Sequence, residues 1–139
     1  MLLLDMSAYA RLGHPALSAE RRDELHRAAT ERRLGTCLPF LLEVGYSTRS
    51  APDHRELLEE LSGLPSFPID AEAERRALDA QQQLARVANH RLPPADLIIA
   101  AVADRHECGV LHYDAHYDTI AQMTDLRFEA VWLAGPGSL

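Results

Sequence analysis

Four acidic residues occupy positions where a carboxylate could do chemistry. Asp5 and Asp114 each directly follow a short, largely apolar run, whereas Glu43 and Asp96 each lie a few residues after a proline, among apolar neighbours. A charged side chain in apolar surroundings is unfavourable unless it is paired, exposed or bound to a cation. These four acids are therefore the first candidates for a functional site.

The chemistry open to clustered carboxylates is that of a hard divalent metal ion. Like charges that lie close together raise each other's pKa, and a cation relieves that repulsion. Oxygen ligands favour Mg²⁺ or Mn²⁺ over Zn²⁺, and such an ion can activate water and stabilise the leaving oxygen of a phosphodiester. We therefore predict metal-assisted phosphodiester hydrolysis, with Asp5, Glu43, Asp96 and Asp114 as both catalytic and metal-binding residues.

Each acid also has a structural interpretation when it is taken alone. Asp5 and Asp114 could form turns after strands, and Asp96 could offset the dipole at the start of a helix. Glu43 is harder to explain in this way, because it interrupts the apolar run of residues 41–44. The functional interpretation depends on all four acids meeting in space.

The elements that must position these acids alternate between strands and helices. Apolar runs predict strands, and helical spacing or capping residues predict helices, with Gly109 expected to end the last long helix. Alternation of this kind indicates an α/β fold with a mainly parallel sheet of four to five strands. The predicted strands are 1–4, 34–38, 66–69, 110–113 and 130–133, and the predicted helices are 18–33, a hairpin over 39–63, 70–88, 95–103 and 115–123.

This arrangement places the acids at one edge of the sheet. In open α/β sheets, ligands bind beyond the carboxyl ends of the strands. Asp5 and Asp114 immediately follow predicted strands, and Glu43 and Asp96 lie near the starts of helices that leave the same end. We therefore expect the four acids to face one crevice.

Length and composition are those of one soluble domain. The chain has 139 residues, of which 47% are hydrophobic and 25% charged, so we predict a single domain over 1–134 and a flexible tail over 135–139. No apolar run reaches membrane length, and a cytoplasmic protein is expected. Cys37 and Cys108 lack metal-binding spacing and are expected to be buried, reduced thiols.

Net charge counts against a general nucleic-acid binder. The formal charge is −7, and all 14 basic residues are arginine, whereas such binders usually carry excess positive charge. The pairs 21–22, 32–33 and 75–76 are better interpreted as ion-pairing helix faces than as RNA contacts. The absence of lysine disfavours receiver domains and haloacid-dehalogenase-type phosphatases, which share this architecture but typically use a lysine.

Four segments also resemble a known family. Residues 1–7, 41–44, 94–101 and 111–117 are similar in order, spacing and flanking apolar residues to the four acidic motifs of PIN domains, and are closest to the VapC-like toxins of bacterial type II toxin–antitoxin systems. The resemblance covers nearly the whole chain. It implies a three-layer fold and an endoribonuclease that uses a metal-activated water and no side-chain nucleophile.

The same resemblance implies ligands and partners. Asp5, Glu43, Asp96 and Asp114 would hold one or two Mg²⁺ ions, with Mn²⁺ as the alternative ion. The substrate would be RNA, and the partners would be a cognate antitoxin and a second copy of the chain. The hairpin over 39–63 could supply a contact surface, although its leucines could equally be simple core.

Three auxiliary residues follow from the motifs. Ser7 matches a small hydroxyl residue common in the first motif and could orient Asp5 or a water, or cap a helix. His116 stands where many relatives carry a further acid, so the resemblance supports one metal ion more firmly than two. Asp118 could substitute for that acid, or it could lie in solvent on a short helix.

Two competing interpretations remain. The spacing His112-x-Asp114-x-His116 suggests zinc, but no remote ligand with a recognisable pattern completes such a site. A catalytically weak PIN-like module that binds RNA or protein is the alternative from another functional class. Retention of all four acids favours the nuclease.

Overall fold

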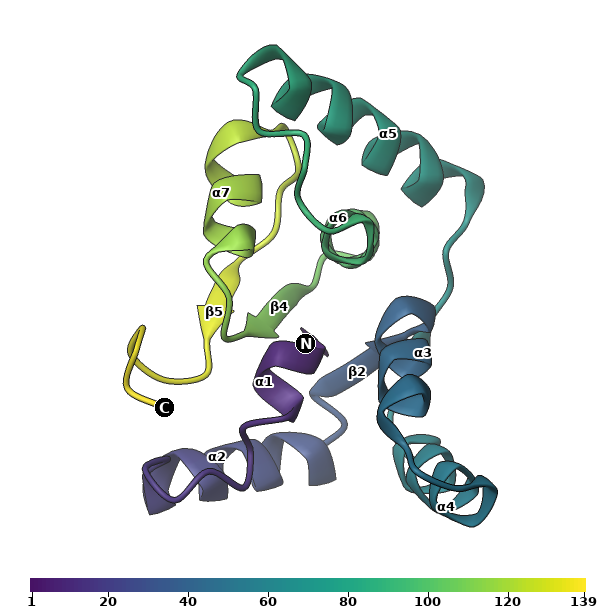
Figure 1. The fold of residues 1–139 in the computed structure, drawn as a ribbon, viewed down its shortest axis with the longest axis vertical. Coiled ribbons are helices and arrows are strands. Elements are labelled where there is room, and N and C mark those ends of the chain that lie inside the picture. Colours follow the sequence, from purple (N-terminus) through teal and green to yellow (C-terminus); the bar gives the residue numbers. More distant parts are fainter.

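The computed structural model describes all residues from Met1 to Leu139 and contains one five-stranded sheet. Every neighbouring pair of strands is parallel, and the order is β3-β2-β1-β4-β5 (Figure 1). The strands are β1 Leu2–Leu4, β2 Leu34–Cys37, β3 Ser66–Phe67, β4 Gly109–His112 and β5 Ala130–Trp132. The predicted α/β fold with a parallel sheet is confirmed.

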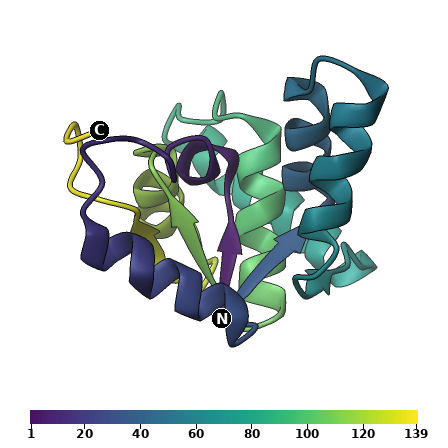
Figure 2. The same cartoon turned by 90° about the horizontal axis from the view of Figure 1, so that it is seen from below.

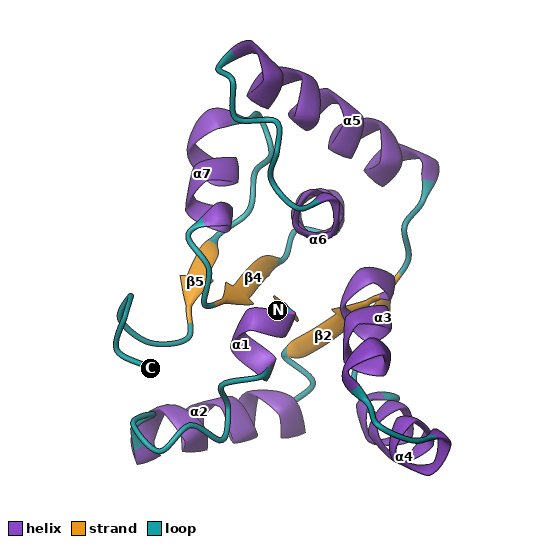
Figure 3. Ribbon diagram, viewed as in Figure 1, coloured by secondary structure: helices purple, strands orange, loops and turns teal.

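Seven helices surround these short strands (Figure 3). Figures 1 and 2 show α2 on one face of the sheet and α6, with α5 beyond it, on the other. This is the expected three-layer arrangement. No helix of the structure combines the length and the apolar character needed to cross a membrane. The helices are α1 Met6–Tyr9, α2 Ala19–Thr30, α3 Leu38–Ser47, α4 Ala51–Leu61, α5 Ala71–Arg86, α6 Pro94–Arg105 and α7 His116–Met123.

The three inner strands, β2, β1 and β4, are largely buried because both faces of the sheet are covered. Leu3 of β1 pairs with Gly35 on one side and Val110 on the other, and all three are buried. Gly35 has no room for a side chain, since an added Cβ would lie 2.8 Å from the ring of Phe67. Small and branched residues therefore allow close packing around the inner strands of the sheet.

Helix α6 is the central helix of the fold, as its nearly continuous apolar sequence predicts. Leu97 and residues 99–103 are at most 3% exposed, because the helix lies between the sheet and α5. Pro94 is its first residue, where a proline's missing N–H is tolerated. The position of Asp96 is thereby fixed in the first turn of a fully packed helix.

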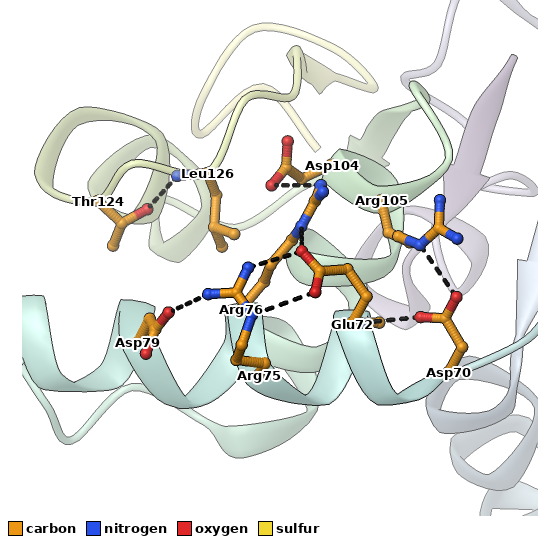
Figure 4. Close-up of polar contacts among 10 residues, drawn as sticks. Asp70, Glu72, Arg75, Arg76, Asp79, Asp104, Arg105, Thr124 and Leu126 are labelled. Carbon is orange, nitrogen blue, oxygen red and sulfur yellow. Dashed lines mark hydrogen bonds and ion pairs between the residues drawn. The ribbon is translucent and has the colours of Figure 1, made fainter.

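Ion pairs connect α5 to α6 (Figure 4). Arg76 contacts Glu72 on its own helix at 3.0 Å and Asp104 on α6 at 3.2 Å, and Arg105 of α6 contacts Asp70 at 2.9 Å. Arg75 also pairs with Glu72. The arginine pair of α5 therefore forms an ion-pairing helix face, as expected.

Some predicted boundaries were wrong. Helix α1 was not predicted, and Leu38 begins α3 instead of ending β2. Gly109 starts β4, while α6 ends at Arg105 and the chain reverses at Glu107, which has a φ of 56°. A glycine suggests a helix end, but Gly109 serves close strand packing, since an added Cβ would lie 2.9 Å from the backbone carbonyl oxygen of Glu129.

The chain's last residues contact the end of β4. The backbone N–H of Leu139 donates a hydrogen bond of 2.7 Å to the hydroxyl of Tyr113. The single domain over 1–134 and the flexibility of residues 135–139 stay predictions.

Candidate active site

The four predicted acids lie at the carboxyl end of the sheet, where the chain order reverses. Strand β1 is central and lies between β2 and β4, so the segments that leave β1 and β4 diverge on opposite sides of this point. A crevice at such a switch point is the usual ligand site of an open α/β sheet. Asp5 directly follows β1 and Asp114 follows β4 by two residues.

Asp5 is 4% exposed and is held through both carboxylate oxygens. Its Oδ2 accepts from the backbone N–H of Ser7 at 2.8 Å and from the Ser7 hydroxyl, which makes Asp5 the N-cap of α1. Its Oδ1 accepts from the hydroxyl of Tyr117 at 2.7 Å. Ser7 Oγ in turn accepts from the N–H of Tyr113 at 2.9 Å. Ser7 therefore connects the ends of β1 and β4.

Asp96 and Asp114 meet at the imidazole of His116. The ring Nδ1 lies 2.9 Å from Asp96 Oδ2 and 3.2 Å from Asp114 Oδ1. One ligand atom from each of these three residues lies within 4.8 Å of the others. Burial first, and then the charge of Asp5, raise the pKa of Asp96 to about 6, against the opposing hydrogen bond from His116.

Glu43, on α3, lies near enough to Asp5 to be affected by its charge. Burial raises its pKa, and the charge of Asp5 raises it further. Burial also raises the pKa of the Cys37 thiol to about 12, with smaller contributions from Asp5 and Glu43. The thiol therefore stays protonated, and Asp5 is the acid whose charge reaches both Glu43 and Asp96.

His112 and Asp118 have partners of their own. The ring of His112 is fully buried against Tyr117 and Trp132, and its Nδ1 accepts from the N–H of Asp114 at 3.2 Å. Burial lowers its pKa, so the ring is neutral. Asp118 Oδ2 accepts from the indole N–H of Trp132 at 2.9 Å. Neither residue joins the group formed by Asp96, Asp114 and His116.

Two residues at the site had no role assigned from sequence. Tyr117 was part of a motif, but its bond to Asp5 spans 112 positions and has no local signal. The guanidinium of Arg11 donates to the Ser7 carbonyl at 2.9 Å and lies 4.7 Å from the ring centroid of Tyr113. Arg11 thus holds its positive charge against Ser7 and Tyr113, the residues that connect the ends of β1 and β4.

Comparison with known proteins identifies the family. Residues 8–123 match the PIN domain. The chain belongs to the PIN-domain family. It is 37% identical to Ribonuclease VapC18 of Mycobacterium tuberculosis over 139 residues, an alignment that covers 98% of this chain and 97% of the relative. Ribonuclease VapC51 of the same organism is 34% identical, with 99% and 96% of the two chains covered.

Solved structures share the fold of this PIN domain. A chain in the crystal structure of DNA-bound VapBC from Salmonella typhimurium superposes with a TM-score of 0.74 at 16% identity, covering 96% of this chain and all of that one. A chain of VapBC2 from Rickettsia felis, bound to a promoter DNA fragment, gives 0.72 at 15% identity, covering 94% and 98%. At these identities the comparison shows the fold alone.

The residues of this PIN domain fit a divalent cation. Burial and the charge of Asp5 raise the pKa of Glu43 and of Asp96, and the charge of Asp114 adds to the rise at Asp96; a cation relieves repulsion of this kind. Asp5 keeps acceptor capacity beyond its three hydrogen bonds, because a carboxylate has about four lone-pair sites. The donor set contains mainly oxygen, which suits Mg²⁺ or Mn²⁺.

Proposed function

We propose that this protein is a VapC-type endoribonuclease toxin that hydrolyses RNA phosphodiester bonds and depends on Mg²⁺, with Mn²⁺ as the alternative ion. The carrying observation is the grouping of Asp96, Asp114 and His116 beyond the carboxyl end of the sheet, with Asp5 near enough for its charge to raise the pKa of both Glu43 and Asp96, in a chain 37% identical to a VapC ribonuclease. The absence of a competent side-chain nucleophile supports hydrolysis by water. Ser7 Oγ is committed to two hydrogen bonds, and the Cys37 thiol is protonated.

The chain's own residues would hold and orient the cation. Asp96 and Asp114 approach each other through His116, and Asp5 is fixed by Ser7 and Tyr117. When bound, the ion supplies the Lewis acidity that activates water and stabilises the leaving oxygen. Rigid hydrogen bonds to the ligands matter because they keep the carboxylates in place before the substrate arrives.

An RNA substrate needs positive charge at the site despite the net charge of −7. The bound cation and Arg11 would supply it. Arg11 is held by the Ser7 carbonyl and by the Tyr113 ring, and it forms no ion pair with a carboxylate. A planar guanidinium fixed in this way suits a phosphate of the RNA strand.

An antitoxin partner is proposed on the strength of the VapBC relatives and of one apolar groove. A cavity of about 490 Å³ between α1, α2 and α4 is lined mainly by hydrophobic side chains, including Leu12, Leu25 and Leu64.

A homodimer is also proposed, because Leu38, Leu42 and Tyr46 recur every four residues on the exposed side of α3. Exposed apolar stripes of this kind mark protein contact surfaces.

Cleavage of RNA by the purified protein, with and without metal, tests the proposal. EDTA should abolish cleavage, and Mg²⁺ or Mn²⁺ should restore it. Asp5→Asn should lower the rate by about 100-fold or more, because it removes a ligand charge. Asp79→Asn on the exposed side of α5 is the matched control and should cleave at the normal rate. Cleavage unaffected by EDTA and by Asp5→Asn would favour the binding-module alternative.

A further inference from the structure

His116 lies between two acids of the proposed metal site, at the position where a further acid was expected from the family resemblance. We propose that His116 binds the catalytic cation directly through Nδ1, so that the site has mixed imidazole and carboxylate ligands and a raised selectivity for Mn²⁺ over Mg²⁺. This inference rests on the proposed function and deepens it.

The geometry matches that of neighbouring ligands on one ion. Two ligands at right angles on an octahedral ion, each bonded at about 2.1 Å, lie about 3 Å apart. His116 Nδ1 lies 2.9 Å from Asp96 Oδ2 and 3.2 Å from Asp114 Oδ1. Little movement is therefore needed for the three atoms to surround a cation, which would take the Nδ1 lone pair once that nitrogen carries no proton.

His116 is held in place by its backbone and by its position in the fold. It is the first residue of α7, and its N–H donates to Asp114 Oδ1 at 3.0 Å. Its side chain is 37% exposed, whereas that of Asp96 is 11% exposed. The imidazole thus forms the solvent side of the site, and Asp96 forms the buried side.

The nearby His112 cannot take this role. Its ring is fully buried, and its Nδ1 accepts the N–H of Asp114. It also lies outside the group of three residues whose ligand atoms lie close together. The assignment is therefore specific to His116.

An imidazole changes which ion such a site prefers. Mg²⁺ is small and hard and takes oxygen ligands, whereas transition-metal ions accept imidazole nitrogen readily. Mn²⁺ tolerates both kinds of ligand, so exchanging an oxygen ligand for Nδ1 weakens Mg²⁺ more than Mn²⁺. The competing role for His116 is to remain outside the coordination shell and donate its Nδ1–H to Asp96, which would leave the ion preference unchanged.

Pulsed electron paramagnetic resonance on the Mn²⁺-loaded full chain separates these roles. Direct binding of His116 should give the ¹⁴N modulation of a coordinated imidazole, which His116→Asp should abolish. His90→Asn, an exposed change in the loop before α6, is the matched control and should keep the signal. By calorimetric titration, His116→Asp should lower the ratio of Mn²⁺ to Mg²⁺ affinity by about 10-fold.

The outcomes distinguish this assignment from the function on which it rests. Mn²⁺ bound to the unmutated protein without imidazole modulation would overturn the role of His116 and leave the metal-dependent nuclease intact. Failure to bind Mn²⁺ would overturn the role of His116, and failure to bind either Mn²⁺ or Mg²⁺ would overturn both. The decisive spectrum is that of the unmutated protein, so the result does not depend on whether the His116→Asp variant folds.

Discussion

At the scale of single residues, Asp5 shows how a proposed metal ligand is held in a fixed orientation by its neighbours. Ser7 holds one carboxylate oxygen and Tyr117 holds the other. Tyr117 is fully buried, so its hydroxyl has little freedom to leave Asp5. Hydrogen bonds of this kind fix the orientation of a ligand and keep the site from rearranging.

Tyr117→Phe should therefore weaken cation binding while keeping the packing of the ring. We expect the Mn²⁺ affinity to fall by about 10-fold, because Asp5 loses one of the bonds that orient it. The free energy of unfolding should fall by about 1–3 kcal/mol, since a buried carboxylate oxygen loses its donor. Calorimetric titration and urea unfolding measure the two effects.

Tyr46→Phe is the matched control, because Tyr46 is 93% exposed, its hydroxyl has no partner in the site, and the change keeps the ring that contributes to the proposed dimer surface. It should change neither quantity. Unaltered Mn²⁺ affinity in Tyr117→Phe would show that Ser7 alone is enough to orient Asp5.

At the scale of elements, three helices end on non-glycine residues in the left-handed region. Arg32, Ala88 and Glu107 follow α2, α5 and α6 with φ values of 56°, 58° and 56°. In each case the next N–H reaches back to the last turn, as from Asn89 to the Leu84 carbonyl at 2.8 Å. This conformation costs about 1–2 kcal/mol for a residue with a side chain.

Ala88→Gly should stabilise the protein, because glycine adopts positive φ without that cost. We expect the free energy of unfolding to rise by up to about 1 kcal/mol, the difference between relieved strain and the greater freedom of glycine in the unfolded chain. Ala85→Gly, three residues earlier and also exposed, lies inside α5 and should lower it by about 1 kcal/mol. Urea unfolding should show changes in the free energy of unfolding of opposite sign for the two variants. Equal losses in both would contradict the presence of strain at Ala88.

Element boundaries were also where sequence reasoning failed. Gly109 was expected to end α6, but the chain turns at Glu107. A glycine satisfies two different needs, positive φ and close packing, and local sequence does not distinguish them. The four residues of α1 were missed because a single turn has no periodicity, and it exists through the Asp5 cap.

At the scale of the whole molecule, the carboxylate cluster makes stability depend on pH. Asp96 has a pKa of about 6 in the folded protein, against 3.8 for the free side chain. Between these values the folded state binds more protons than the unfolded state, so the free energy of unfolding falls as pH rises. Ionisation of Asp96 lowers the free energy of unfolding by at most about 3 kcal/mol, and this loss is complete above pH ~7.

Urea unfolding in EDTA at pH 4 and pH 7.5 tests this effect in the wild type and in Asp96→Asn. Asp96→Asn should gain stability relative to the wild type as pH rises, because it lacks the buried charge. Adding Mn²⁺ at pH 7.5 should stabilise the wild type much more than the variant. A difference between the two proteins that is the same at both pH values would refute the burial of this charge.

The sequence by itself determined the type of fold and the identity of the acids. Apolar runs and helical spacing are local properties, so the alternation of strands and helices follows from the sequence. The rule that parallel strands carry ligands at their carboxyl ends then placed Asp5 and Asp114 at one edge. The metal-binding roles of the four acids stay predictions, whereas their location at this edge is a feature of the structure.

Only the tertiary structure decided which side chains touch these acids. His116 contacts Asp96 and Asp114. Tyr117 donates a hydrogen bond to Asp5, and Asp118 accepts one from Trp132. Asp118 and His116 lie two positions apart in the sequence and on the same short helix, yet they have unrelated partners. Such contacts depend on how helices and strands pack across tens of residues, and sequence spacing within a motif does not specify that packing.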